Sequence, residues 1–357
     1  SGNSPIIAAL AQAAENGKQV TVLVELKARF DEENNIAWAK KLEQAGCHVI
    51  YGLVGLKTHS KIALVVRREE DGIRRYVHLG TGNYNDQTAK LYTDMGLLTC
   101  SDAIGEDATA VFNMLSGYSE PKKWNKLAVA PIWLKDKFLM LIGREAENAR
   151  QGKKARIVAK MNSLCDPVIM NALYDASKAG VKIELIVRGI CCIKAGVPGL
   201  SDNISVRSIV GNYLEHSRIF YFYNDGFEDI YMGSADWMPR NLDKRVEITF
   251  PVEDPELKKK IKNILKIQLE DTLKNMFLEG SLSFNDEVCI TNMRHKAALM
   301  DAKESLKQVT ESIAQDMPED FFSIDLMSAY ESLGTIIGEA VDDDLVNEIF
   351  SKFCMGK

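Results

Sequence analysis

The sequence lacks several features that would place the chain in other classes of protein. It has no run of about 18 apolar residues and no secretory signal pattern, so we expect neither a membrane span nor secretion. Its seven cysteines are scattered and form no C-x-x-C pair, which predicts reduced thiols and a cytoplasmic protein. A Gly-rich loop of the GxxxxGK[ST] type is also missing, which excludes a P-loop nucleotide site.

The composition that is present is that of an ordinary globular protein. Of the 357 residues, 46% are apolar and 26% are charged, enough for two or three domains with sizeable cores. The charge is uneven, because residues 281–357 carry six basic and fifteen acidic residues, whereas residues 1–280 carry 38 and 35. A polyanionic ligand is therefore tolerated by the first part of the chain and repelled by the last.

Two histidines, His59 and His216, lie in similar local sequences. Each is followed two positions later by a basic residue, Lys61 or Arg218, and then by an apolar run and a turn rich in small and polar residues. Two such sites could bring two imidazoles and two cations together around a phosphate. The other three histidines, His48, His78 and His295, are interpreted as ordinary surface or core residues.

The similarity between the two regions extends upstream of the histidines. Residues 13–24 parallel residues 176–187, and in each copy a helix ends at a glycine and a β-branched run follows. An arginine lies just beyond each run, Arg29 in the first copy and Arg188 in the second. Because a repeat is harder to obtain by chance than one short motif, these parallels predict an internal duplication.

Apolar periodicity and turn residues predict an α/β fold with two domains, residues 1–126 and 127–280, followed by an all-α helical tail at 281–357. We expect helices over 4–17, 33–45, 106–115, 133–151, 166–179 and 255–277, and strands over 20–25, 47–52, 61–67, 75–79, 155–160, 182–188, 204–210, 218–223 and 229–233.

Segments in both expected domains carry a resemblance to a known family, namely residues 24–34, 55–61, 80–85, 91–94, 185–189, 213–216 and 234–238. Residues 1–280 resemble the C-terminal part of bacterial polyphosphate kinases. The resemblance implies two phospholipase-D-like α/β domains, the first of them truncated at its N-terminus. The aspartate that the wider phospholipase D pattern carries five residues after its lysine is missing, since Val66 and Tyr223 stand there. This absence weakens the rival interpretation, a phosphodiesterase or nuclease.

The resemblance implies roles for particular residues. His59 matches the phosphorylated histidine and His216 the second active-site histidine, while Tyr92 and Arg188, together with His216, match residues that contact the nucleotide. Arg29 matches a position associated with Mg²⁺ and phosphate. Because arginine has no acceptor lone pair, we expect Arg29 to hold the phosphates that Mg²⁺ also holds. The charge of a phosphoryl-transfer transition state makes Lys61 and Arg218 further candidate phosphate ligands, with His216 placed to stabilise or protonate the departing oxygen.

The activity that the resemblance implies is reversible transfer of the terminal phosphate of ATP to polyphosphate through a phosphohistidine. Mg²⁺, ATP or ADP, and polyphosphate are the expected cofactor and partners, and no specific nucleic acid is expected. The alternative is a catalytically impaired fragment that binds polyanions or nucleotide and carries a helical interaction module.

The tail resembles the C-terminal helical part of the MnmE-type tRNA-modification GTPases, on residues 292–295, 333–339 and 349–357. In that family the terminal lysine and a nearby cysteine belong to a folate site, which Lys357 and Cys354 match. We interpret these two as a solvated chain end and a buried thiol. The tail is then a packing element, and a homo-oligomer formed through it is a further hypothesis.

Overall fold

The computed structural model describes residues 4–25, 32–53, 55–85, 88–117, 121–209, 212–278, 293–314 and 319–337. The chain divides into two compact units, residues 1–274 and 275–357, and each is described by itself. Within the first unit we call residues 1–126 the N-terminal half and residues 127–274 the C-terminal half.

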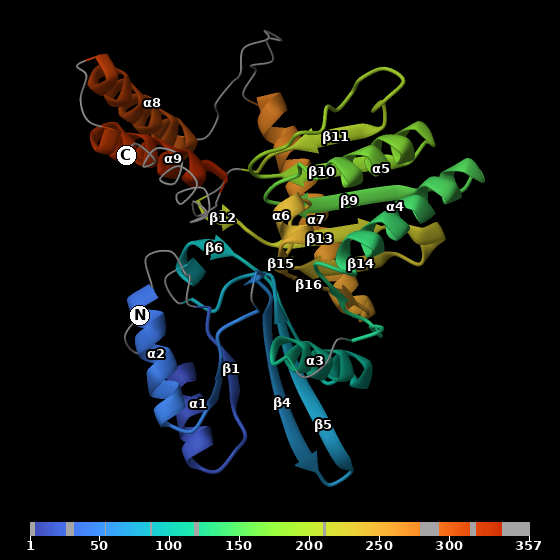
Figure 1. Cartoon of the computed structure of the whole chain (residues 1–357). Helices are drawn as coiled ribbons and strands as arrows, with labels where there is room; N and C mark the ends of the chain where they lie inside the picture. Colours follow the sequence, from blue (N-terminus) through green and yellow to red (C-terminus); the bar gives the residue numbers. More distant parts are fainter. Residues whose placement is uncertain are drawn as a thin grey trace. The chain divides into compact units, whose positions relative to one another are not determined.

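The N-terminal half holds two separate small sheets (Figure 1). Strands β1 and β2 pair in parallel, and β4, β5 and β7 form an antiparallel sheet in which β4 and β5 make a long hairpin. The elements are α1 (Pro5–Glu15), β1 (Thr21–Leu23), α2 (Glu32–Gln44), β2 (His48–Ile50), β3 (Lys57–Thr58), β4 (Lys61–Glu69), β5 (Gly72–Gly80), β6 (Tyr92–Thr93), β7 (Gly96–Thr99) and α3 (Asp102–Leu115).

The C-terminal half contains a seven-stranded sheet in the order β11-β10-β9-β13-β14-β16-β8. Strands β9, β10 and β11 are parallel, and β13, β14, β16 and β8 continue the sheet in antiparallel pairs. The elements are β8 (Ala128–Val129), α4 (Leu134–Arg150), β9 (Arg156–Met161), α5 (Pro167–Lys178), β10 (Lys182–Val187), β11 (Ile204–Arg207), β12 (Leu214–Glu215), β13 (Arg218–Phe222), β14 (Asp229–Gly233), α6 (Pro239–Asp243), β15 (Arg245–Val246), β16 (Ile248–Val252) and α7 (Pro255–Leu278).

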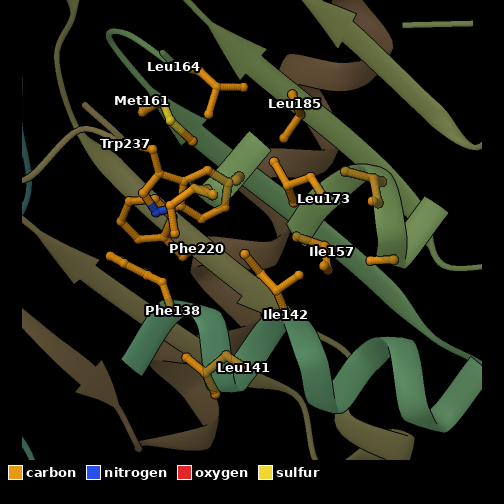
Figure 2. Packing of buried hydrophobic residues seen from close by; sticks show 14 of the residues in the cluster. Phe138, Leu141, Ile142, Ile157, Met161, Leu164, Leu173, Leu185, Phe220 and Trp237 are labelled. Atoms are coloured by element: carbon orange, nitrogen blue, oxygen red, sulfur yellow. The ribbon is translucent and has the colours of Figure 1, made fainter. Parts of the chain in front are cut away.

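Helices α4 and α5 pack their apolar faces on one side of this sheet. Figure 2 shows Phe138 of α4 beside Phe220 of β13 and Trp237, and the Phe220 and Trp237 rings stack with centroids 5.2 Å apart. All three side chains are fully buried. Burial of aromatic side chains of this size removes 150–250 Å² each from water, so this cluster anchors the C-terminal half.

A second core cluster contains residues of both halves. Val77 and Leu79 of β5 and Val111 of α3 are buried together with Ile219 of β13 and Ile248 of β16. The N-terminal and C-terminal halves therefore share a hydrophobic core, which holds the beginning of β4 near the beginning of β13.

The second unit is described through two helices, α8 (Met293–Ala314) and α9 (Glu319–Ile337). They pack against each other, with Ala298, Ala302 and Ala329 buried between or beside them. None of the helices that the structure describes is long and apolar enough to cross a membrane.

The predicted mixed α/β architecture is confirmed, and most predicted elements coincide with observed ones. Helix α1 begins after Ser4, whose hydroxyl accepts a hydrogen bond from the Ile7 N–H, and Gly17 follows it with φ of 77°. Strand β16 was not predicted, and it holds Pro251 although proline is uncommon on an inner strand. Proline is tolerated there because β8 pairs with β16 only at Ile248 and Thr249. The side of β16 that faces β8 is therefore unpaired at Pro251.

Candidate active site

Two short parallel strand pairs place the two histidines. Strand β3 pairs with β15, and the backbone N–H groups of His59 and Ser60 both donate to the carbonyl of Val246, at 2.9 and 3.0 Å. The backbone next to His59 is thus held by the opposite half of the unit.

The second histidine is held in the same way. Strand β12 pairs with β6, and the N–H groups of His216 and Ser217 donate to the carbonyl of Thr93, at 3.3 and 3.0 Å. Each half therefore supplies a two-residue strand that receives the other half's histidine.

A carboxylate from the opposite half orients each imidazole. His59 Nδ1 lies 2.9 Å from a Glu247 carboxylate oxygen, and His216 Nδ1 lies 2.9 Å from an Asp94 oxygen. Glu247 and Asp94 are the first residues after β15 and β6, respectively. Because an ionised carboxylate only accepts hydrogen bonds, each neutral imidazole carries its proton on Nδ1 and leaves a lone pair on Nε2.

A hydroxyl group fixes each carboxylate in turn. Thr81 Oγ1 donates to Asp94 at 2.7 Å, and the Ser234 hydroxyl donates to Glu247. The two hydroxyl–carboxylate pairs have the same sequence separation of 13 residues. Gly82 makes room for the first pair, since a Cβ at that position would lie 2.0 Å from an Asp94 oxygen.

Both imidazoles are held in the neutral form. Burial lowers the pKa of His59 to about 4, with the nearby Lys61 and Arg245 charges acting in the same direction and Glu247 against it. Burial also lowers the pKa of His216 to about 4, assisted by the Arg218 charge. At neutral pH both Nε2 atoms are therefore unprotonated.

The two Nε2 atoms differ in what they contact. His216 Nε2 accepts a hydrogen bond from Arg218 Nη1 at 2.9 Å. His59 Nε2 has no hydrogen-bond partner among the side chains of the described residues, and the His59 side chain remains 20% exposed. Of the two, His59 has the geometry of a nucleophile, whereas His216 Nε2 is already engaged. Protonation of a departing oxygen by His216 would require that bond to break.

Arg218 is a buried structural cation as much as a candidate phosphate ligand. Its Nε and Nη2 donate to the two oxygens of Asp236 at 3.1 and 3.2 Å, and Nη1 also donates to the His216 carbonyl at 2.8 Å. Asp236 further accepts the Asn162 N–H at 2.8 Å. Most of the guanidinium is thus occupied in positioning the loop around His216.

The charge of Lys61 acts on both histidines. Its ammonium is buried, donates to the His59 carbonyl, and is close enough to His59 and His216 to lower the pKa of both. Burial lowers its own pKa to about 7, with the Arg218 and Arg245 charges adding to the effect and Glu247 opposing it. An anion that binds beside this amine would raise its pKa and so keep it protonated.

The two residues expected to contact a nucleotide border the same site. The Tyr92 ring lies 4.9 Å from the His216 ring, centroid to centroid, with the planes tilted by 48°. Arg188 follows β10, and its Nε donates to the Asn162 side chain at 2.9 Å. Asn162 also contacts Asp236, so Arg188 is linked to Arg218 through hydrogen bonds.

The structure thus brings His59, His216, Tyr92, Lys61, Arg188 and Arg218 to one region. Arg29, Cys354 and Lys357 lie outside the described residues. Sequence reasoning missed Glu247 and gave Asp94 no role. The signal that could have found them is the acidic residue 13 positions after Thr81 and Ser234 in the two copies.

The donor set is poorly suited to a protein-made metal cage. Within the described ranges, no group of three or more His, Cys, Asp or Glu side chains could hold a metal ion. Asp94, Glu247 and Asp236 are all engaged by a histidine or an arginine. Magnesium is commonly held through one or two carboxylates plus substrate phosphates.

Together these observations define a mixed α/β protein with a site in which two histidines lie beside the cations Lys61 and Arg218. Comparison with known families refines this class. Residues 1–121 match the model of the polyphosphate kinase C-terminal domain 1, and residues 127–297 match that of the polyphosphate kinase C-terminal domain 2. Over residues 1–297 the chain belongs to the polyphosphate kinase family.

Individual relatives agree with this assignment. A polyphosphate kinase of Synechocystis is 63% identical over 271 residues, covering 76% of this chain and 37% of that protein. One of Halalkalibacterium halodurans is 62% identical over 274 residues, covering 77% and 39%. The crystal structure of polyphosphate kinase from Porphyromonas gingivalis superimposes with a TM-score of 0.69 at 44% identity, over 75% of this chain and 44% of that one. The chain therefore spans about two fifths of the length of these relatives.

Proposed function

We propose that this chain carries the phosphoryl-transfer site of a polyphosphate kinase, and that it transfers the terminal phosphate of ATP reversibly to polyphosphate through His59. The observation that carries the proposal is the His59 imidazole, which is neutral, oriented by Glu247 through Nδ1 and open at Nε2. Membership of the polyphosphate kinase family supplies the substrate class.

The transfer requires two balanced steps. In the first, the His59 Nε2 lone pair forms a bond to the γ-phosphorus of ATP, and the bond from that phosphorus to the ADP oxygen breaks. In the second, a terminal oxygen of polyphosphate attacks the phosphorus, the P–N bond breaks, and the imidazole regains its lone pair. Glu247 stabilises the positive charge that the imidazole acquires while it is phosphorylated, in the way a carboxylate supports a catalytic histidine.

The cations have the complementary task of stabilising the charge on the transferred group. Lys61 is the best placed of them, since its electrostatic influence reaches both histidines. We propose that Arg188 and Arg29 contact the nucleotide phosphates, that Tyr92 stacks on the base, and that His216 contacts the nucleotide and stabilises the departing oxygen. Mg²⁺ bound to ATP would neutralise part of the phosphate charge.

Several broader proposals accompany the function. The matched hydrogen bonds around His59 and His216 support an origin by duplication and a phospholipase-D-like fold for both domains, with bounds at 1–126 and 127–280. The tail, which resembles the C-terminal helical part of the MnmE-type GTPases, is proposed as a helical packing element and a self-association surface. A cytoplasmic location agrees with the free thiols of the described cysteines.

The test is a labelling experiment with γ-labelled ATP and Mg²⁺ on the purified chain. We expect acid-labile, alkali-stable protein phosphate that disappears in His59→Ala. The matched control is His48→Ala, because His48 is exposed on β2 and makes none of the contacts described for the site. Absence of label in a folded chain that still binds nucleotide would instead favour the alternative, an impaired polyanion- or nucleotide-binding fragment.

A further inference from the structure

Two cysteines lie side by side where the segments that follow β9 and β10 run in parallel. Leu164 and Cys191 form a parallel bridge between these segments. The Leu164 N–H donates to the Ile190 carbonyl, and the Leu164 carbonyl accepts from the Cys192 N–H, each at 2.8 Å. Cys165 and Cys192 directly follow the bridged pair, so they are the next residues in register.

Burial places the side chains of Cys165 and Cys192 on the same face. Leu164 is fully buried in the core shown in Figure 2, and Cys191 packs against the same cluster. Because successive side chains of an extended segment point to opposite sides, Cys165 and Cys192 point away from this core. Cys192 is exposed and Cys165 is half-buried, in agreement with the alternation. A small molecule dissolved in water can therefore reach the pair.

The spacing of Cys165 and Cys192 suits a disulfide. Paired strands lie about 4.8 Å apart, and a disulfide joins Cα atoms that are about 4.4–6.8 Å apart. The pKa of Cys165 is raised to about 11 by burial and, next in size, by the charge of Cys192. A charge effect of this rank requires that the two sulfur atoms lie close together. Both thiols are free in the structure.

We propose that Cys165 and Cys192 are a site of reversible oxidation by hydroperoxides, at which the two thiols form a disulfide. Cys192 reacts first, because it is exposed and because Cys165, with a pKa of about 11, stays protonated at neutral pH. The Cys192 thiolate attacks one oxygen of the hydroperoxide, the O–O bond breaks, and the other oxygen takes a proton and leaves as water or an alcohol. The product at Cys192 is a sulfenic acid.

The second step closes the disulfide. The Cys165 sulfur attacks the sulfenic sulfur of Cys192, the S–O bond breaks, and the hydroxide leaves with the Cys165 proton as water. In total the two thiols lose two electrons and two protons, and the hydroperoxide gains them. Cys191 is a poor partner in this step, because its side chain packs against the core on the other face.

The oxidation site lies next to a residue of the candidate active site. Asn162, three residues before Cys165, accepts a hydrogen bond from Arg188 Nε at 2.9 Å. Arg188 lies four residues before Cys192. The disulfide therefore joins the two segments that hold Arg188. The oxidation involves neither ATP nor His59, so it is independent of the proposed transfer reaction.

The test is mass spectrometry of the purified full chain after brief treatment with hydrogen peroxide, with the remaining thiols alkylated before digestion with trypsin. Trypsin releases Cys165 in the peptide 161–178 and releases Cys192, together with Cys191, in the peptide 189–194. We expect these two peptides to be joined, two hydrogen atoms lighter than their sum, in roughly tenfold excess over any other cysteine pair. Dithiothreitol should release both peptides again.

Variants identify which sulfur atoms form the bond. Cys192→Ser should abolish the joined peptide, and Cys165→Ser should do the same if Cys192→Ser does not fold. Cys191→Ser is the matched control within the same peptide and should give the wild-type yield. Circular dichroism checks the fold of each variant. The proposal is overturned if the folded wild-type chain gives no joined peptide, if the bond survives in Cys192→Ser or Cys165→Ser, or if it is lost in a folded Cys191→Ser.

Discussion

At the scale of single residues, the site depends on side chains that hold the histidines. The contact between His59 Nδ1 and Glu247 fixes which nitrogen carries the proton, and thereby which nitrogen has the lone pair. The hydrogen bond between Arg218 and His216 Nε2 makes the two histidines unequal although their surroundings are otherwise alike. The proposed nucleophile is distinguished by its partners, since both histidines have the same low pKa.

Glu247→Gln should slow phosphorylation of His59 on the order of 10²-fold, because the amide cannot stabilise the charged imidazole and also allows the wrong tautomer. The measurement is the single-turnover rate of label incorporation. Glu253→Gln changes a half-exposed carboxylate paired with Lys126 and serves as the control. A rate in Glu247→Gln equal to that of the control would remove Glu247 from the mechanism.

The pH dependence of the reaction should reflect two shifted pKa values. Because the pKa of His59 is about 4, its imidazole stays neutral well below pH 6.5, and the rate should not fall through that range. The pKa of Lys61 is about 7, so its positive charge is lost as pH rises through 7 in the free protein. At subsaturating ATP, where the free protein titrates, labelling should therefore be flat from about pH 5 to 6.5 and decline above 7.

Lys61→Arg tests whether deprotonation of Lys61 causes the decline in labelling above pH 7. Arginine keeps its charge at all accessible pH values, so the decline above pH 7 should vanish whatever the absolute rate becomes. Lys178→Arg, at an exposed lysine of α5 that makes none of the described contacts of the site, should leave the decline in place. Persistence of the decline in Lys61→Arg would show that another group titrates.

At the scale of elements, short strands and a tight turn position the carboxylates. Strand β6 ends directly before Asp94, and the Gly80-Thr81-Gly82 turn supports that residue through the Thr81 hydroxyl. Gly82 contributes by having no side chain, since the Asp94 carboxyl group occupies the space in which a Cβ would lie. The turn therefore has a packing role in addition to its backbone conformation.

Gly82→Ala should lower the free energy of unfolding by about 1–3 kcal/mol, because Asp94 or β6 must move to accept the methyl group. The Asp94–His216 contact should be lost with it. Gly143→Ala is the matched control, since nothing lies within 4 Å of its Cβ position on α4, and it should stabilise by about 1 kcal/mol. Urea unfolding of both variants measures the difference, and equal effects of the two substitutions would contradict this account.

Elements with strong local sequence patterns could be predicted from the sequence. Elements that depend on residues far away in the chain could not. The strands that begin at Lys61 and Arg218 follow the histidine motif closely, and both were predicted. Strand β16 carries Pro251 and was missed, because its tolerance of proline depends on how far β8 extends along it. Glu247 was missed for a related reason, since its partner His59 lies 188 residues earlier in the chain.

At the scale of the whole molecule, the described contacts of the site are made within residues 1–274, which form a compact unit separate from the tail. A chain that ends after Leu278 should therefore label at His59 at a rate within about twofold of the full chain, because it keeps every described contact of the site. Label incorporation by the two chains under identical conditions is the measurement. A much larger loss would assign the tail a direct part in the reaction.

Each histidine is oriented by a carboxylate from the opposite half, and this arrangement has a consequence for folding during synthesis. The proposed nucleophile His59 lies in the first half, but Glu247, which orients it, and Val246, which binds its backbone, come near the end of the second half. During synthesis, domains fold from the N-terminus onwards. In a nascent or half-folded chain the imidazole would lack this orientation, so the proposed phosphorylation of His59 would require that both halves have folded and docked.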